Sequence, residues 1–182
     1  MKKIAVLIAL LGGLLLTGCA APQEVSTKPG APTSAAKAGG SEEPDEGDNV
    51  TKVGTWATAE DGLSFRVAKL KRAKVGAYAA GGKPGGPAVI VTVQIRNTGK
   101  TRFDTTMFQI GTRVGADGTE ADQVFDSERG YGDGFTGTVA PGRTATVKYM
   151  FAAEGAADLK TVSVELTPGF EYESFTFEGA AT

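Results

Sequence analysis

Hydrophobic and polar residues alternate along the chain from about residue 51 onward, a pattern typical of β-strands that bury one face. Residues 88–97 show it most clearly, because Val89, Val91, Val93 and Ile95 fall on one side and polar residues mostly on the other. The pattern predicts further strands at residues 53–58, 63–67, 103–114, 136–140, 143–151, 161–166 and 174–177.

Short turn signals separate these runs, and no stretch keeps a helical period for three turns. Asn97-Thr98-Gly99 follows one predicted strand, and Asp117-Gly118 tolerates the positive φ that a tight hairpin requires. Seven to nine short strands in about 130 residues predict a single antiparallel β-sandwich domain over residues 51–182.

The N-terminus has the features of an export signal. Lys2 and Lys3 form a positive start, and residues 4–16 carry no charge. Because a membrane-spanning helix needs about 20 apolar residues, this shorter stretch fits the core of a signal peptide. We predict a signal peptide over residues 1–18, cleaved between Gly18 and Cys19.

The run Leu16-Thr17-Gly18-Cys19 resembles the bacterial lipobox, in which the cysteine thiol receives a diacylglyceryl group. The resemblance implies that Cys19 is the lipidation site, and two acyl chains anchor a protein stably. Cys19 is the only cysteine, so it cannot form an intramolecular disulfide. We expect a protein held by lipid at the extracytoplasmic face of the cell membrane. The alternative is that Cys19 is an apolar residue of an ordinary secretory signal.

Residues 19–50 have the composition of a disordered linker, with four prolines among Ala, Gly, Ser and Thr and no aromatic residue. A group of acidic residues near its end is interpreted as a solvated, self-repelling spacer, with an acidic docking patch as the alternative. These acids are Glu42, Glu43, Asp45, Glu46 and Asp48.

Charge is distributed unevenly between the linker and the predicted domain. Without the signal peptide, the chain carries 17 basic and 21 acidic residues, a net charge of −4. Residues 50–182 hold 15 of each, so the domain is neutral overall. A nucleic-acid-binding domain would show a basic excess, and we therefore expect no nucleic-acid partner.

The composition excludes several kinds of catalysis. The chain has no histidine, and its one cysteine is assigned to lipid, which excludes Ser-His-Asp and Cys-His catalysis and zinc sites built from His or Cys. A carboxylate-dependent hydrolase stays open as a less favoured alternative, but the sequence places no two carboxylates together. We expect no enzymatic activity and no cofactor.

A basic cluster is the first candidate binding site. Polymers of the cell wall and lipid headgroups are anionic partners that such a cluster would attract. The favoured interpretation is nevertheless the solvent face of an edge strand, where lysines discourage aggregation. The cluster consists of Arg66, Lys69, Lys71, Arg72 and Lys74.

An acidic, glycine-rich stretch is the second candidate. Asp126, Glu128 and Asp133 could supply oxygen ligands to calcium. Their spacing differs from that of an EF-hand loop, and Arg129 lies among them. A solvated loop is the favoured interpretation, so no metal is expected.

Two further features are predicted to be mainly structural. Residues 76–87 are rich in glycine but precede a strand rather than a helix, unlike a phosphate-binding loop. We interpret them as a mobile connector that could carry Tyr78 to a partner. Trp56, the only tryptophan, is expected to pack in the core or at an edge, with a binding role as the alternative.

Three segments resemble a widespread family of bacterial lipoproteins of unknown function. They are the strand and Asn-Thr-Gly turn of residues 88–100, the hairpin of residues 108–119, and the Pro-Gly turn and strand of residues 140–151. The resemblance covers roughly residues 60–178 and departs at 76–86 and 126–135. It implies an all-β, immunoglobulin-like antiparallel sandwich, similar to a small secreted mycobacterial antigen, and brings no catalytic residues.

Together these features predict a membrane-anchored extracytoplasmic lipoprotein. Its sandwich is expected to act as a binding or structural module for an envelope protein or a cell-wall component. The alternative is an accessory ligand-binding or polyanion-binding lipoprotein of a transport system.

Overall fold

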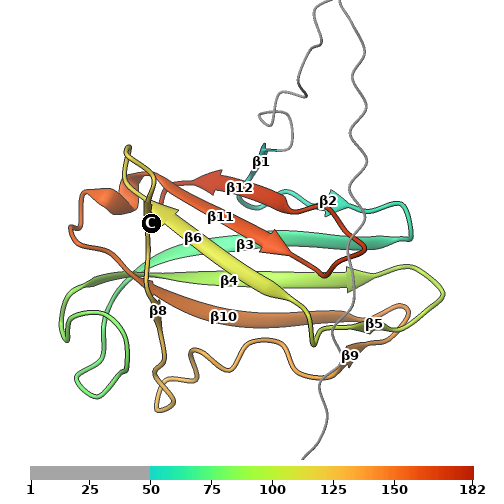
Figure 1. Ribbon diagram of the computed structural model, residues 1–182, viewed down its shortest axis with the longest axis horizontal. Helices are drawn as coiled ribbons and strands as arrows, with labels where there is room; N and C mark the ends of the chain where they lie inside the picture. The colour runs from blue at the N-terminus through green and yellow to red at the C-terminus, as the bar shows by residue number, and fades with distance from the viewer. Residues whose placement is uncertain (1–49) are drawn as a thin grey trace, which may run out of the picture. The chain divides into compact units, whose positions relative to one another are not determined.

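The computed structural model describes residues 50–182, so the predicted signal peptide, Gly18, Cys19 and nearly all of the linker lie outside the described residues. The described part forms two five-stranded sheets, which Figure 1 shows as two layers, and a separate two-stranded ribbon. Between residues 50 and 182, no helix is long and apolar enough to cross a membrane.

The first sheet, here called sheet A, has the strand order β1-β12-β11-β6-β7. Its pairs are antiparallel except for the parallel pair β1–β12, an exception that the sequence pattern did not predict. Its strands are β1 (Val50–Lys52), β12 (Phe175–Gly179), β11 (Val162–Thr167), β6 (Gln109–Val114) and β7 (Thr119–Glu120).

The second sheet, sheet B, is antiparallel throughout, with the order β2-β3-β4-β10-β8. A ribbon of β5 (Phe103–Asp104) and β9 (Thr138–Val139) and the short 3-10 helix η1 (Asp158–Lys160) complete the fold. The strands of sheet B are β2 (Ala57–Thr58), β3 (Leu63–Lys74), β4 (Pro87–Asn97), β10 (Thr144–Ala152) and β8 (Gln123–Val124).

The core fills the space between the sheets with the alternating apolar residues that the sequence pattern predicted. Val89, Val91, Val93 and Ile95 of β4 are fully buried, and they face apolar residues of sheet A. Burial of this kind is the main stabilising contribution in a sandwich. The facing residues of sheet A include Val162, Val164, Leu166 and Phe177.

Phe65 of β3 lies at the centre of an aromatic cluster at one end of this core. Its ring centroid is 5.2 Å from that of Phe175 and 5.8 Å from that of Phe103, and it also contacts the rings of Phe108 and Tyr172. Aromatic pairs at such separations add to the stabilisation that burial alone provides.

The predicted turn at Asn97 is confirmed and has a structural role. The Asn97 side chain is buried; its amide donates to the carbonyl oxygens of Thr101 and Val139, each at 2.8 Å, and its Oδ1 accepts from Gly99 N–H at 2.9 Å. Because a buried amide must be paired, this residue fixes the end of β4 against β9.

The predicted all-β sandwich is confirmed, and it has more strands than expected. Residues 50–182 contain twelve strands, five of which have only two residues. The stretch 103–114 divides into β5 and β6, because a turn from Thr105 to Phe108 interrupts it. β3 continues to Lys74, well beyond the predicted end at residue 67.

The glycine-rich connector, interpreted from the sequence as mobile, is hydrogen-bonded beside β8 of sheet B. Ala80 and Phe125 exchange two backbone hydrogen bonds of 2.8 and 2.9 Å, and Gly81, at φ +87°, approaches the carbonyl of Gln123 too closely for any side chain. The connector covers a small apolar cluster that includes Val124 and Met150. Tyr78 is nevertheless 88% exposed.

Candidate functional site

Five cationic side chains share the outer face of sheet B. The pairing register puts Lys69 of β3 and Lys148 of β10 on either side of Thr92 of β4. Because alternate residues of a strand point to the same side, the other cations can be assigned from the same register. We call this set the basic face; it consists of Arg66, Lys69, Lys71, Arg96 and Lys148.

No carboxylate lies among the outward positions of β3, β4 and β10. The remaining outward residues of these strands are small, apolar or uncharged polar. Although residues 50–182 are neutral overall, none of the outward positions of these three strands carries an opposing negative charge. These remaining residues are Ser64, Ala73, Ala88, Ile90, Thr92, Gln94, Thr144, Thr146, Met150 and Ala152.

A β-bulge in β3 creates this arrangement. The register shifts between Val67 and Lys69, so that Ala68 is an extra residue in the strand. A bulge of one residue reverses the alternation that follows it. Val67 and Leu70 consequently both face the core, and Lys69 joins Arg66 on the outside.

The bulge also divides the predicted basic cluster. Arg72 and Lys74 lie on the opposite side of β3 from Lys69. Arg72 donates from Nε to the carbonyl of Ala181 at 2.9 Å and from Nη1 to the carbonyl of Ala156 at 2.8 Å, so its guanidinium ties chain segments together. The structure therefore places Arg66, Lys69 and Lys71 of the predicted cluster on one surface, and Arg72 and Lys74 on the opposite side of β3.

Trp56, just before β2, lies against the basic face. The guanidinium carbon of Arg66 is 4.3 Å from the centre of its ring system, and that of Arg96 is 4.5 Å from it. Both distances are within the range of cation–π attraction. The half-buried indole thus packs at an edge, as predicted, while it also forms part of the candidate site.

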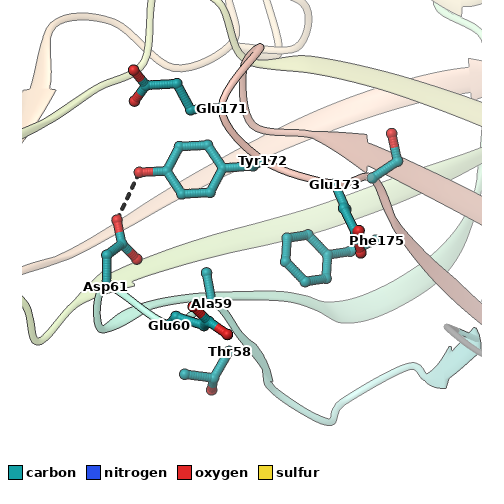
Figure 2. Close-up of a pocket in the computed structure, with 9 residues that line it drawn as sticks. Thr58, Ala59, Glu60, Asp61, Glu171, Tyr172, Glu173 and Phe175 are labelled. Atoms are coloured by element: carbon teal, nitrogen blue, oxygen red, sulfur yellow. Dashed lines mark hydrogen bonds between the residues drawn. The ribbon is translucent and has the colours of Figure 1, made fainter.

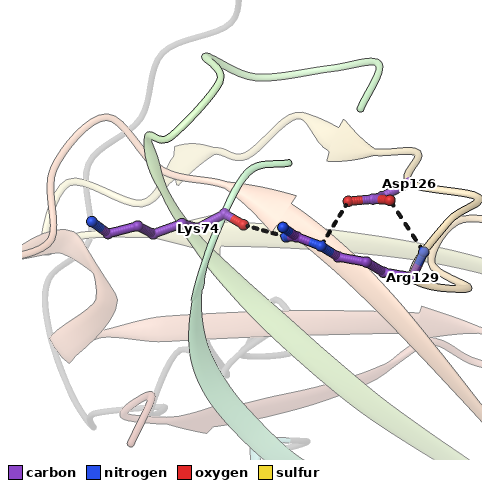
Figure 3. A network of polar contacts seen from close by, with 3 residues as sticks. All are labelled: Lys74, Asp126 and Arg129. Atoms are coloured by element: carbon purple, nitrogen blue, oxygen red, sulfur yellow. Dashed lines mark hydrogen bonds and ion pairs between the residues drawn. The ribbon is translucent and has the colours of Figure 1, made fainter. Parts of the chain in front are cut away.

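The candidate calcium ligands Asp126, Glu128 and Asp133 differ in their surroundings. Asp126 is buried, and its carboxylate accepts from Arg129 N–H at 3.2 Å and pairs with Arg129 Nε at 3.5 Å. Figure 3 shows Arg129 also donating to the carbonyl of Lys74. Glu128 and Asp133 are exposed, and within residues 50–182 no group of three His, Cys, Asp or Glu residues could hold a metal ion.

An open acidic groove of about 520 Å³ lies at one end of the sandwich. Figure 2 shows its aromatic wall, formed by Tyr172 and Phe175. Tyr172 Oη donates to Asp61 Oδ2 at 2.7 Å, and burial together with this hydrogen bond raises the pKa of Tyr172 to about 12. Its four carboxylate residues are Glu60, Asp61, Glu171 and Glu173.

The carboxylates of the groove are exposed to solvent and do not lie in an apolar setting. A carboxylate-dependent hydrolase keeps one carboxyl group protonated by holding it in an apolar setting. All four acidic residues of the groove are exposed to solvent. The groove therefore favours attraction of a cationic group over acid–base chemistry.

The sequence alone did not predict that Trp56, Arg96 and Lys148 lie in one site. The alternation did place Arg96 and Lys148 on the polar sides of their strands, which is the only signal that could have found them. Their proximity to Arg66 and Lys69 depends on which strands pair, and this information lies in the fold. The groove was missed for the same reason, since Asp61 and Tyr172 are far apart in sequence.

No known protein family and no curated protein matches the sequence. The fold is similar to that of the yjhA protein from Bacillus subtilis, with a TM-score of 0.56 and 16% identity over 70% of this chain and 98% of that one. It is also similar to ycdA, a candidate lipoprotein of Bacillus subtilis, with a TM-score of 0.53 and 16% identity over 70% of this chain and 38% of that one.

An uncharacterized β-sandwich protein of Clostridium difficile 630 matches with a TM-score of 0.45 and 14% identity, covering 72% of this chain and 93% of that one. The likeness to the two Bacillus subtilis proteins shows the sandwich fold alone, because their identities to this chain are low.

Proposed function

We propose that this chain is a lipid-anchored, extracytoplasmic binding module whose basic face engages an anionic polymer of the cell envelope. The observation that carries the proposal is the clustering of Arg66, Lys69, Lys71, Arg96 and Lys148 on one sheet face without a carboxylate among them. The role is binding rather than catalysis.

The spacing of the charges suits an extended ligand. Neighbouring strands lie about 4.8 Å apart and alternate residues of one strand about 7 Å apart, so Lys69 and Lys148 are separated by roughly 10 Å across the sheet. A flat array of cations at such intervals can contact several repeating charges of a linear polymer at once. Each contact releases counterions, which adds to the binding free energy.

The lipid anchor and the linker support the same role. A diacylglyceryl group on Cys19 would hold the domain at the membrane, and a linker of about 30 residues would let it reach on the order of 30 Å outward. Confinement of the domain beside an envelope polymer raises the effective concentration of the polymer at the basic face. Contacts that are individually weak are then sufficient for binding.

Accessory ligand binding is the second candidate function, and the acidic groove favours it. Four carboxylates and an aromatic wall would attract a cationic group of a small ligand or of a protein partner. Phe170, in the loop between β11 and β12, is 92% exposed beside Glu171 and would add apolar contact area.

The proposed function is tested by titrating the chain from residue 19 onward, with Cys19→Ala, with polyphosphate at several salt concentrations. If five cations each neutralise one phosphate, log K should fall against log salt with a slope of about −3.5, as for single-stranded polyanions. Between 50 and 200 mM salt, affinity should therefore fall by about 100-fold. Binding that is absent at 50 mM salt, or insensitive to salt, would rule out the proposal.

A further inference from the structure

The two arginines of the basic face share one aromatic platform without an acidic partner. The guanidinium carbons of Arg66 and Arg96 lie 4.3 and 4.5 Å from the centre of the Trp56 ring system. Neither forms an ion pair with any carboxylate in the described part of the chain. Because both groups lie within 4.5 Å of one ring centre, their Cζ atoms are at most about 9 Å apart, and an anion at the rim of the ring would be attracted by both unpaired charges.

The two side chains are held in place by different contacts. Arg66 donates from Nε to Gln94 Oε1 at 2.8 Å, and Gln94 Nε2 donates to Thr146 Oγ1 at 3.2 Å, so a polar chain across β3, β4 and β10 fixes its orientation. Arg96 Nε is buried and has no hydrogen-bond partner within residues 50–182. The terminal nitrogens of both guanidinium groups also form no hydrogen bond within residues 50–182.

We propose that Arg66, Arg96 and Trp56 form a subsite for one phosphate group of the bound polymer. This inference rests on the proposed function and names the chemistry that the basic face selects. Two guanidinium groups can donate to different oxygens of a tetrahedral phosphate, whereas the coplanar oxygens of a carboxylate are satisfied by one guanidinium fork. Lys69, Lys71 and Lys148 attract neighbouring phosphates as point charges and add little discrimination between anions.

Trp56 reports on this subsite directly. It is the only tryptophan of the chain, and both guanidinium groups lie over its ring. The emission of Trp56 should therefore change when an anion is bound there. We would titrate the chain from residue 19 onward, with Cys19→Ala, with polyphosphate and with polyglutamate, a carboxylate polymer, and follow this emission together with binding measured by calorimetry.

The decisive variant is Arg96→Lys, which keeps the charge and removes the planar fork. We expect its polyphosphate affinity to fall about tenfold, because a charged hydrogen bond is lost. Its polyglutamate affinity and its salt slope should not change. Arg66→Lys should behave in the same way. Agreement between the two variants would show that the loss of affinity does not come from a packing defect in one of them. The matched control is Lys148→Gln, which should lower the salt slope by about one and leave the preference for phosphate intact.

The outcomes separate the subsite from the proposed function. Equal affinities of wild type, Arg96→Lys and Arg66→Lys for polyphosphate would overturn the subsite and leave polyanion binding standing. Absence of all polyanion binding would overturn both.

Vesicles of phosphatidylcholine with and without phosphatidylglycerol distinguish the source of the phosphate. Tighter Arg96-dependent binding to anionic vesicles than to polyphosphate identifies lipid headgroups as the source, and the reverse identifies a soluble or wall polymer.

Discussion

Reversing two charges on the basic face, with Lys69→Glu and Lys148→Glu together, should weaken polyphosphate binding by about 100-fold or more at 50 mM salt. The two lysines lie on either side of Thr92 at the middle of the sheet. A polymer bound across the middle of the basic face would therefore contact both lysines. Each substitution removes one attraction and adds one repulsion at the site of contact. The affinity is measured by calorimetry for the variant and the wild type in the same buffer.

A matched control separates the face from net charge. Lys52→Glu with Lys160→Glu makes the same change in charge at two exposed positions, one in β1 and one in η1, away from the outer face of sheet B. This control should weaken binding only a few-fold, because exposed charges beyond a Debye length are screened. Equal losses in both double variants would show that overall charge, and not the basic face, governs binding.

Replacing Phe65 with alanine should lower the free energy of unfolding by about 4 kcal/mol, as typical for a buried phenylalanine. Phe65 is fully buried, and it packs against four other aromatic rings that close one end of the sandwich. Its removal deletes apolar contacts and leaves a cavity between rigid neighbours. The change is measured by denaturant unfolding of the chain from residue 19 onward.

Phe170→Ala is the matched control for this prediction. The same side chain is removed there, but Phe170 is 92% exposed, so the free energy of unfolding should change by no more than about 0.5 kcal/mol. A small effect at Phe65, close to that at Phe170, would mean that the aromatic cluster does not organise the core.

Much of the sandwich could be predicted because its strands follow a strict alternation. The inward residues of β4 and β10 were assigned correctly, since both strands pair over nine consecutive positions without irregularity. The turn at Asn97 was recognised from its residue types alone. The two-residue strands were not predicted, because two residues are too few to show a period.

The candidate site was harder to predict because it depends on one irregular residue and on strand pairing. With uninterrupted alternation, Arg66, Arg72 and Lys74 would share a face, and Lys69 would lie on the other. The bulge at Ala68 reverses this assignment, and nothing in the local sequence marks its position. Arg96 and Lys148 join Arg66 only because β3, β4 and β10 are neighbours in the sheet.

The most direct test of the basic face is to map a bound polyanion onto the chain by amide and indole chemical shifts in nuclear magnetic resonance. On addition of short polyphosphate, we expect the largest shifts at Lys69, Thr92, Arg96 and Lys148 and at the indole N–H of Trp56. Shifts that concentrate instead around Asp61 and Tyr172 in the acidic groove, or that spread evenly over the surface, would contradict this expectation.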